Sequence, residues 1–157
     1  RPSRRATCTT PSCASARALH WAGYSTRCHV AAAAVVVVHD VAEGTQRHFR
    51  KHEDDVLCIA AHRGRGLVAS GQKAFKKKGV MHKPTIFVWD AAQPAADQAR
   101  AGPLVFTGCN QRFISLLAFD PSGDILCSVG NDDDHLLVLW DWARGAALAH
   151  VQTHKEP

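Results

Sequence analysis

The sequence predicts an all-β chain built from a repeated unit, and three observations support this. Short apolar segments rich in β-branched residues follow one another, turn residues separate them, and no stretch keeps a helical period. Some segments, such as 56–61 and 136–140, are nearly unbroken apolar runs, which indicates strands that are covered on both faces. One arrangement of segments also occurs twice along the chain.

Ten segments have the composition of strands. They are residues 35–39, 46–49, 56–61, 67–71, 85–90, 103–107, 114–119, 125–130, 136–141 and 147–152. Residues 1–18 are rich in Ser, Thr, Arg and Ala without periodicity, so we expect them to be disordered or foreign to the fold. The chain opens on Arg1, which we interpret as a truncated start, and the ordered part is expected from Leu19.

Composition narrows the class of protein. The chain is 46% hydrophobic and 21% charged, which is typical of a globular protein. Its longest apolar run, 30–38, is about half the length of a membrane-spanning helix, so no membrane segment is expected. The six cysteines are scattered, and Cys58, Cys109 and Cys127 lie in or beside strand-like runs, which favours reduced thiols in the cytosol.

Two patterns resemble metal sites but fit them poorly. Cys8, Cys13, Cys28 and His29 offer four zinc ligands, but only the first two have a usual spacing. Residues 131–135 contain three consecutive Asp, whereas a calcium loop alternates its ligands. Asn and Asp are also the residues that a hairpin turn prefers. We therefore predict a turn at 131–135 and no cofactor.

The repeated unit has three parts. Residues 56–62 and 114–120 are each followed by a turn, then by a strand that ends in Gly, and then by a strand that ends in Trp-Asp. Trp89 and Trp140 lie 51 residues apart, whereas a propeller repeat has about 40 to 45 residues. The first unit is longer because it contains a lysine-rich stretch, residues 73–83.

This unit predicts a partial WD-repeat β-propeller of about two to three four-stranded antiparallel blades. A blade buries its apolar faces only against neighbouring blades, so one blade alone is not expected to be stable. The Trp that ends each third strand needs a partner for its indole N–H. Ser70 and Ser128, at matching places on the second strands, are the candidates.

In the generic WD-repeat pattern a His, a Ser or Thr, an Asp and the Trp form a hydrogen-bonded set. Similarity to that pattern implies structural roles for His52, Ser70 and Trp89, whereas Asn110 and Gln111 stand where the second unit should have its His. His52 as catalytic base or metal ligand is the competing interpretation, but no nucleophile motif accompanies it. Structural roles are also expected for Asp90, Ser128, Trp140 and Asp141.

Residues 19–28 resemble the hydrophobic motif that opens the propellers of the echinoderm microtubule-associated protein-like (EMAP-like) family. The motif is carried by Trp21, the pair Gly23-Tyr24 and the pair Arg27-Cys28, and the resemblance implies that Trp21 and Tyr24 belong to the core. The similarity extends to about residue 154. It continues in order through residues 46–49, 52–56, 69–72, 86–90 and 131–142, the last with a characteristic Trp-Asp-Trp ending.

The chain departs from the family pattern in two ways. First, residues 30–38 are shorter than the corresponding stretch of the family, where an additional strand and turn follow the position of Cys28. Second, the chain ends after about two blades, whereas family members carry two joined propellers. We therefore expect a partial propeller over 19–157. It is divided into an incomplete blade with the hydrophobic motif (19–52), a blade with the lysine-rich insertion (53–108) and a further blade (109–157).

The resemblance implies a non-enzymatic binding module of the microtubule cytoskeleton in the cytoplasm, with tubulin as its partner. The formal net charge of +5 suits tubulin's acidic surface. A lysine run is typical of a solvated loop, but its insertion in a blade makes it the candidate contact. This presumed loop carries Lys73, Lys76, Lys77, Lys78 and Lys83.

The alternative function is a general WD-repeat protein-interaction scaffold that does not meet tubulin, because one fold hosts many functions. An enzyme is disfavoured, since the sequence lacks paired carboxylates in a plausible site, a Gly-rich phosphate loop and a nucleophile elbow. The basic stretches lack the interleaved aromatic residues of a nucleic-acid groove. Neither nucleic acid nor a membrane is therefore expected as a partner.

Overall fold

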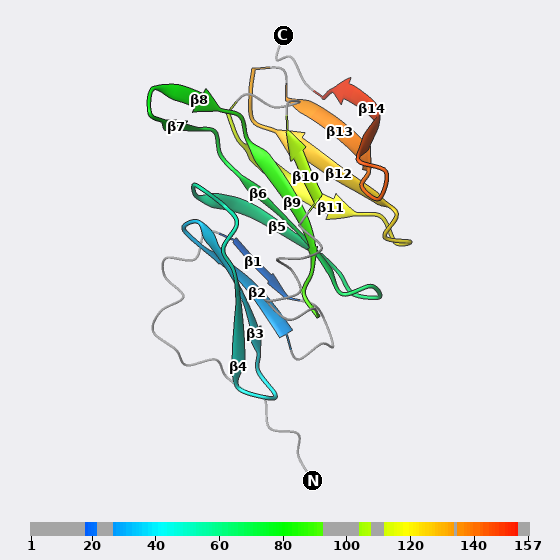
Figure 1. Cartoon of the computed structure of the whole chain (residues 1–157). Coiled ribbons are helices and arrows are strands. Elements are labelled where there is room, and N and C mark those ends of the chain that lie inside the picture. Colours follow the sequence, from blue (N-terminus) through cyan, green and yellow to red (C-terminus); the bar gives the residue numbers. More distant parts are fainter. Residues whose placement is uncertain (1–17, 22–26, 93–103, 108–111, 134, 154–157) are drawn as a thin grey trace.

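The computed structural model describes the backbone of residues 18–21 and 104–107, and all atoms of residues 27–92, 112–133 and 135–153 (Figure 1). Within these ranges the chain forms fourteen strands and no helix. Consequently, none of the described residues belongs to a helix long and apolar enough to cross a membrane.

Twelve of these strands form three four-stranded antiparallel sheets, which we call the first, second and third blades. The first blade contains β1 (Ala18–Trp21), β2 (Arg27–Ala32), β3 (Val35–Asp40) and β4 (Thr45–Phe49). The second contains β5 (Val56–His62), β6 (Leu67–Gln72), β9 (Thr85–Asp90) and β10 (Leu104–Thr107). The third contains β11 (Ile114–Phe119), β12 (Ile125–Gly130), β13 (Leu136–Asp141) and β14 (Ala146–Gln152). A separate hairpin, β7 (Phe75–Lys77) and β8 (Val80–His82), projects from the second blade (Figure 1).

All ten strands predicted from the sequence are present, and four further strands were missed. The apolar run 30–38 is divided between β2 and β3 by a two-residue turn at Ala33 and Ala34, since Ala32 pairs with Val35. Ala33 adopts a left-handed φ of 51°, as such hairpin turns require. The stretch was expected to be too short for the additional strand and turn of the family pattern. Both are nevertheless present, as β2 and the turn at Ala33 and Ala34.

The first blade is a complete four-stranded sheet, where the sequence predicted an incomplete blade over 19–52. It also contains a third copy of the repeat, in which His39 takes the place of the Trp before Asp40. In this copy, as in the third blade, a Gly with positive φ follows the Asp by four residues. These glycines are Gly44 (65°) and Gly145 (70°).

The second blade is covered on both faces, as its unbroken apolar runs predicted. Side chains alternate along β9, so that Trp89 packs with Val36 and Phe49 of the first blade. Ile86 and Val88 point the other way and pack with the core of the third blade. The strands at the start of each blade adjoin one another, because β5 contacts both β1 and β11.

Only one face of the third blade is covered within the described chain, although 136–140 was predicted to be covered on both. Val138 and Trp140 are buried against the second blade. The opposite face carries a cross-strand apolar row, Leu116, Val129, Leu137 and Val151, whose end members are 50% and 56% exposed. This face has the composition of an inter-blade surface, and its four residues belong to neither of the two apolar cores of the described chain.

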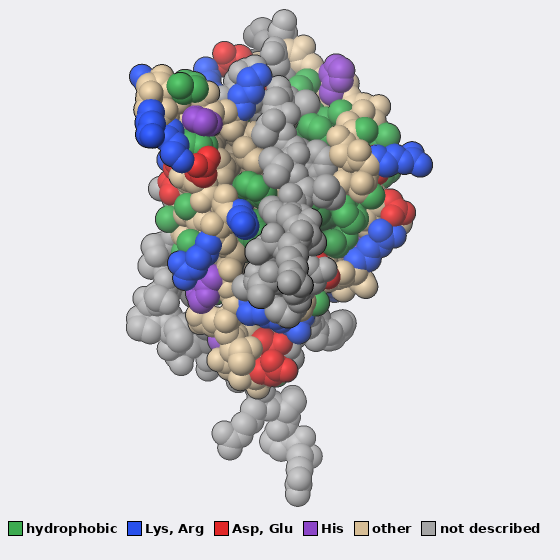
Figure 2. Space-filling model, viewed as in Figure 1, with side chains coloured by type: hydrophobic (Ala, Val, Ile, Leu, Met, Phe, Trp, Pro, Cys, Tyr) green, Lys and Arg blue, Asp and Glu red, His purple; other side chains and the backbone are tan. Residues whose placement is uncertain are grey.

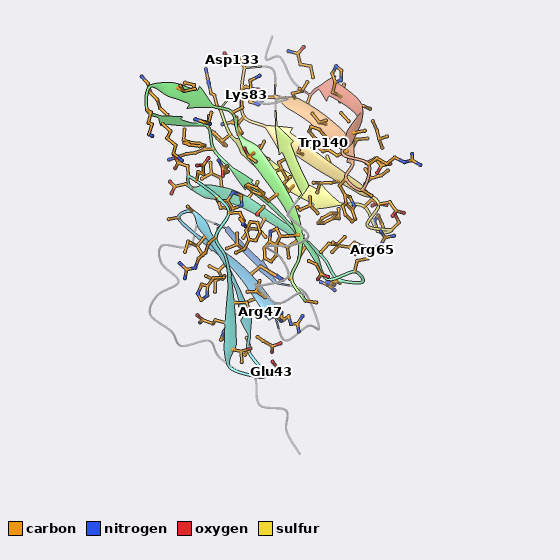
Figure 3. The ribbon with its side chains drawn as sticks, in the orientation of Figure 1. Glu43, Arg47, Arg65, Lys83, Asp133 and Trp140 are labelled. Atoms are coloured by element: carbon orange, nitrogen blue, oxygen red, sulfur yellow. The ribbon has the colours of Figure 1, made fainter. Side chains whose placement is uncertain are left out.

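Two arginines also join neighbouring blades near their edges (Figure 3). Arg47 on β4 donates to the backbone carbonyl of Ala92 at 3.0 Å and so connects the first blade to the second. Arg65, between β5 and β6, lies 2.8 Å from Asp124 of the third blade. Both contacts are solvent-exposed, so they contribute little stability beside the two apolar cores.

The second and third blades approach each other closely at Gly71 on β6. A Cβ atom at this position would lie 2.8 Å from Cys58 Sγ and 2.9 Å from Ile114 Cβ, which is closer than packed atoms tolerate. We expect Gly71→Ala to lower the free energy of unfolding by about 1 to 3 kcal/mol, because β11 must move away. Urea unfolding followed by tryptophan fluorescence measures this change.

Gly64→Ala is the matched control, since its nearest neighbour would lie at an ordinary 3.4 Å. It should change stability by less than about 0.5 kcal/mol. A Gly71→Ala chain that unfolds at the same urea concentration as the wild type would contradict this close packing of the two blades.

Candidate functional site

The buried polar centre of the second blade is a chain of hydrogen bonds through His52. His52 lies in the connection between β4 and β5 and is 6% exposed. Its Nε2 is 2.7 Å from Ser70 Oγ, and its Nδ1 is 2.9 Å from Gln72 Oε1. The indole N–H of Trp89 donates to the same Ser70 oxygen at 3.2 Å. The chain thus joins the inter-blade connection to β6 and β9.

Donors and acceptors in this chain all match when the imidazole is neutral and carries its proton on Nδ1. The amide oxygen of Gln72 also accepts from the backbone N–H of Glu53 at 3.2 Å, so we assign the His52 proton to Nδ1. Nε2 then accepts from the Ser70 hydroxyl, and the Ser70 oxygen accepts from Trp89. Each of these buried polar atoms has a partner, which a network in a low-dielectric interior requires.

Burial favours the same protonation state. Desolvation lowers the pKa of His52 from 6.5 to about 4, and the hydrogen bond with Gln72 opposes this shift only in part. His52 is therefore neutral at physiological pH. Its ring is also packed edge-on against Phe87, with centroids 4.7 Å apart and planes at 90°. These contacts support the structural interpretation of His52 over the catalytic one.

Phe49, at the end of β4, connects this network to the first blade. Its ring stacks on Trp89 with centroids 4.5 Å apart and planes 3° apart. Phe49 is 2% exposed, so the pair removes a large apolar area from water. Trp89 therefore donates a hydrogen bond within its own blade while its ring face packs against a neighbouring blade.

The third blade contains the corresponding Trp–Ser pair. The indole N–H of Trp140 donates to Ser128 Oγ at 2.9 Å, as the matching positions of Ser70 and Ser128 predicted (Figure 3). The second Trp of the Trp-Asp-Trp ending, Trp142, donates to the carbonyl of Gly123 at 2.7 Å. Asn110 and Gln111, which stand in place of the His, lie outside the described residues.

The Asp of each Trp-Asp pair stabilises the turn that follows its strand. Asp90 accepts from the backbone N–H of Ala92 at 2.7 Å, and Asp141 accepts from that of Arg144 at 3.0 Å. In the second blade, the fourth member of the hydrogen-bonded set is Gln72, whose amide oxygen lies 2.9 Å from His52 Nδ1. The sequence did not predict this residue, because the generic pattern has an Asp in this role. Trp21 ends β1 opposite Cys28, whereas Tyr24 lies outside the described residues.

The lysine-rich stretch is a hairpin rather than the presumed loop. Lys78 and Gly79 form its two-residue turn with φ values of 49° and 84°, which are the signs that a type I′ turn requires. At its base, Phe75 stacks on His82 with centroids 4.6 Å apart. The backbone N–H of Ala74 donates to the carbonyl of Arg112 at 2.7 Å, so the hairpin is also attached to the third blade.

The structure separates the five candidate lysines into two groups. Lys73 lies 3.2 Å from Asp54 and 3.1 Å from Asp55, and hydrogen bonding to Asp55 is the largest cause of its raised pKa. Lys77 is ion-paired with Glu53, and this bond lowers the pKa of the Glu53 carboxyl. Lys76, Lys78 and Lys83 are exposed and have no ion pair within the described chain. Blue side chains gather over the hairpin at the upper left of Figure 2.

The predicted turn at 131–135 joins β12 to β13. The N–H of His135 donates to the carbonyl of Asp132 at 3.0 Å, and Asp133 pairs with Arg112 at 3.1 Å. Asp134, Cys8 and Cys13 lie outside the described residues. Among the residues that the structure describes, no group of three or more His, Cys, Asp or Glu is arranged to hold a metal ion.

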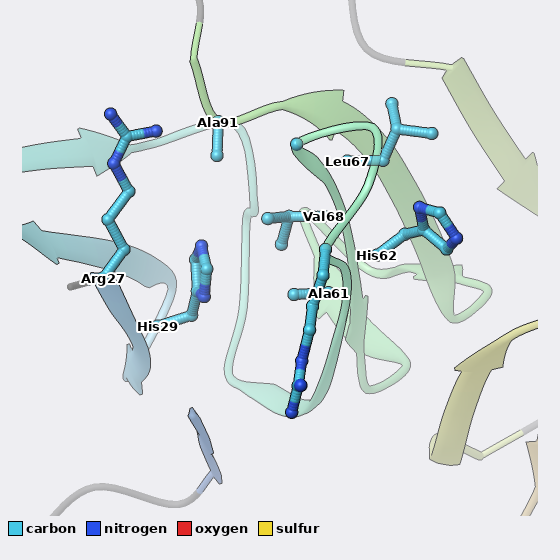
Figure 4. A pocket seen from close by; sticks show the side chains of 9 residues that line it. Arg27, His29, Ala61, His62, Leu67, Val68 and Ala91 are labelled. Atoms are coloured by element: carbon cyan, nitrogen blue, oxygen red, sulfur yellow. The ribbon is translucent and has the colours of Figure 1, made fainter. Parts of the chain in front are cut away.

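A small cavity of about 80 Å³ lies between the first and second blades (Figure 4). Arg27 and His29 of β2 line one side, and Ala61 and Val68 of the second blade line the other. The Arg27 side chain is paired with Asp40 at 3.1 Å. The cavity is well below the roughly 300 to 1,000 Å³ of a typical ligand pocket, so it is a poor candidate for a small-molecule site.

Comparison with curated proteins identifies the family. Over 127 residues, or 79% of this chain, it is 36% identical to echinoderm microtubule-associated protein-like 1 of Rattus norvegicus and 32% identical to echinoderm microtubule-associated protein-like 2 of Homo sapiens. Echinoderm microtubule-associated protein-like 4 of Xenopus laevis is 34% identical over the same length. The chain belongs to the echinoderm microtubule-associated protein-like family. The match spans 15%, 19% and 13% of these three relatives, respectively.

A solved structure agrees on the fold of this EMAP-like chain. The structure of U3-55K, a WD40 propeller, superposes with a TM-score of 0.67 and 21% identity, covering 90% of this chain and 40% of that one. The three blades are therefore part of a WD-repeat β-propeller. No family model matches the chain.

The lowered pKa of His52 predicts how the stability of the EMAP-like chain depends on pH. Between pH 6.5 and about pH 4 the unfolded chain binds a proton at His52 that the folded chain does not bind. The free energy of unfolding should therefore be highest above pH 6.5 and should fall as the pH drops through this window. The expected loss at its lower end is about 3 kcal/mol.

Urea unfolding of the wild type and of His52→Gln across this pH range isolates the effect. The variant lacks the titrating ring, so the difference in stability between the two chains should shrink as the pH falls. Two profiles that stay parallel from pH 7 to pH 4 would show that His52 is not buried in its neutral form.

Proposed function

We propose that this EMAP-like chain is a non-enzymatic module that binds tubulin and microtubules in the cytoplasm. Its relatives are named as microtubule-associated proteins, and over 79% of the chain it aligns with them. The observation that carries the proposal is the hairpin β7–β8, which presents the unpaired side chains of Lys76, Lys78 and Lys83 outside the sheets. These positive charges suit an acidic protein surface.

The mode of binding that we propose is electrostatic docking without chemistry. Lys73 and Lys77 hold the hairpin through Asp54, Asp55 and Glu53, so their charges are largely compensated. The contact is thereby narrowed from five lysines to three. Exposed charges mainly accelerate association and are screened by salt, so binding should weaken as the ionic strength rises.

A general protein-interaction scaffold is the second candidate. The apolar row on the far face of the third blade supports it, because a contiguous exposed apolar surface is typical of protein contacts. Such a scaffold would bind protein partners through this face and would not require the lysines of the hairpin.

Co-sedimentation of the full chain with polymerised tubulin tests the proposal. We expect the triple variant Lys76→Gln, Lys78→Gln, Lys83→Gln to bind about tenfold more weakly at low salt, at roughly 0.5 kcal/mol for each exposed charge. Its affinity should also depend less on salt than that of the wild type. Circular dichroism of each sample checks that the sheets are retained.

Arg50→Gln, Lys51→Gln, Arg63→Gln is the matched control, because it removes the same charge from exposed positions outside the hairpin. It should bind like the wild type. If both triple variants lose the same affinity for polymerised tubulin, the loss comes from the change in net charge and not from the hairpin. A folded wild-type chain that stays in the supernatant would favour the scaffold function.

A further inference from the structure

The hairpin β7–β8 has two chemically different faces. Its register pairs Phe75 with His82, Lys76 with Met81, and Lys77 with Val80. Because neighbouring residues of a strand point to opposite faces, the Lys76–Met81 pair lies on one face and the other two pairs lie on the other.

The face with Phe75 is turned toward the body of the molecule. Phe75 is 9% exposed, and Lys77 on the same face is ion-paired with Glu53. Lys76 and Met81 therefore lie on the outward face. Lys83 follows Met81 by two residues and lies just beyond the end of β8, at the base of the hairpin (Figure 3).

Met81 is the only methionine of the chain, and it is 64% exposed. Methionine is unbranched and polarisable, so it adapts to irregular apolar partners and is common on recognition surfaces. It lies across from Lys76 and close in sequence to Lys78 and Lys83, none of which has an ion pair within the described residues. The outward face of the hairpin thus presents one apolar side chain, Met81, among basic side chains.

We propose that this face recognises an acidic protein segment that carries an apolar side chain, with Met81 as the apolar anchor and the three lysines around it. The proposal rests on the proposed function and makes it more specific, because tubulin would be bound through such a segment. Charge complementarity favours acidic partners in general. Burial of Met81 against an apolar side chain then favours those acidic partners that carry one.

The first arm of the test compares Met81→Thr with Val80→Thr in the full chain. Val80 is the matched control, since it is 60% exposed on the opposite face of the same hairpin. Threonine keeps the preference for a strand in both variants. Met81→Thr should bind polymerised tubulin about tenfold more weakly with an unchanged dependence on salt, which is the loss expected from one buried apolar side chain. Val80→Thr should bind like the wild type.

The second arm separates this inference from the function on which it rests. Fluorescence anisotropy measures binding of the chain to two peptides of equal negative charge, one of glutamate and glycine and one in which leucine replaces some of the glycines. The wild type should prefer the leucine-containing peptide about tenfold, and Met81→Thr should lose that preference.

Each outcome is decisive. If Met81→Thr binds tubulin like the wild type while the lysine variant does not, the inference is wrong and the proposed function stands. If the wild type ignores tubulin but prefers the leucine peptide through Met81, the inference holds for another acidic protein. Equal binding of the two peptides by the wild type, or equal losses for Val80→Thr and Met81→Thr, overturns it.

Discussion

A neutral imidazole held between a hydroxyl and an amide fixes the arrangement of the first two blades. His52 belongs to the segment that leads from one blade to the next, and its partners Ser70 and Gln72 belong to the second strand of the next blade. Trp89 completes the chain from the third strand and stacks on Phe49 of the preceding blade. The apolar cores supply most of the stabilisation, but hydrophobic packing is not directional, and the hydrogen bonds select one geometry.

This fixed geometry has a consequence for the hairpin. The hairpin leaves the second blade directly after Gln72, a member of this network, and returns at Thr85, the first residue of the strand that carries Trp89. Ion pairs of Lys73 and Lys77 with the segment after His52 set its position further. A binding element on a rigid support loses little conformational entropy when a partner docks. The proposed contact surface therefore depends on the structural residues for its position.

Much of the fold could be predicted from the sequence, because the second and third blades follow the repeat closely. The first blade was less predictable from the sequence. Ala33 gives no turn signal within a run of Ala and Val, and the third copy of the repeat was not recognised because His39 replaces its Trp. The hairpin was missed because lysine is a poor strand former. In the candidate site, Ser70 and Ser128 were predictable from their matching positions. The pairing of Lys73 and Lys77 was not, since only the folded chain brings residues 53–55 beside them.

The tautomer of His52 is the most sensitive reporter of this chain of hydrogen bonds. A long-range proton–nitrogen NMR correlation of the labelled chain distinguishes the two ring nitrogens and reports which carries the proton. The hydrogen bonds of His52 require a protonated Nδ1 and an unprotonated Nε2 at pH 7, and the same pattern should be retained at pH 5.5, because its pKa is lowered to about 4. A proton on Nε2 at pH 7, or a charged ring at pH 5.5, would contradict the chain of hydrogen bonds on which the second blade is built.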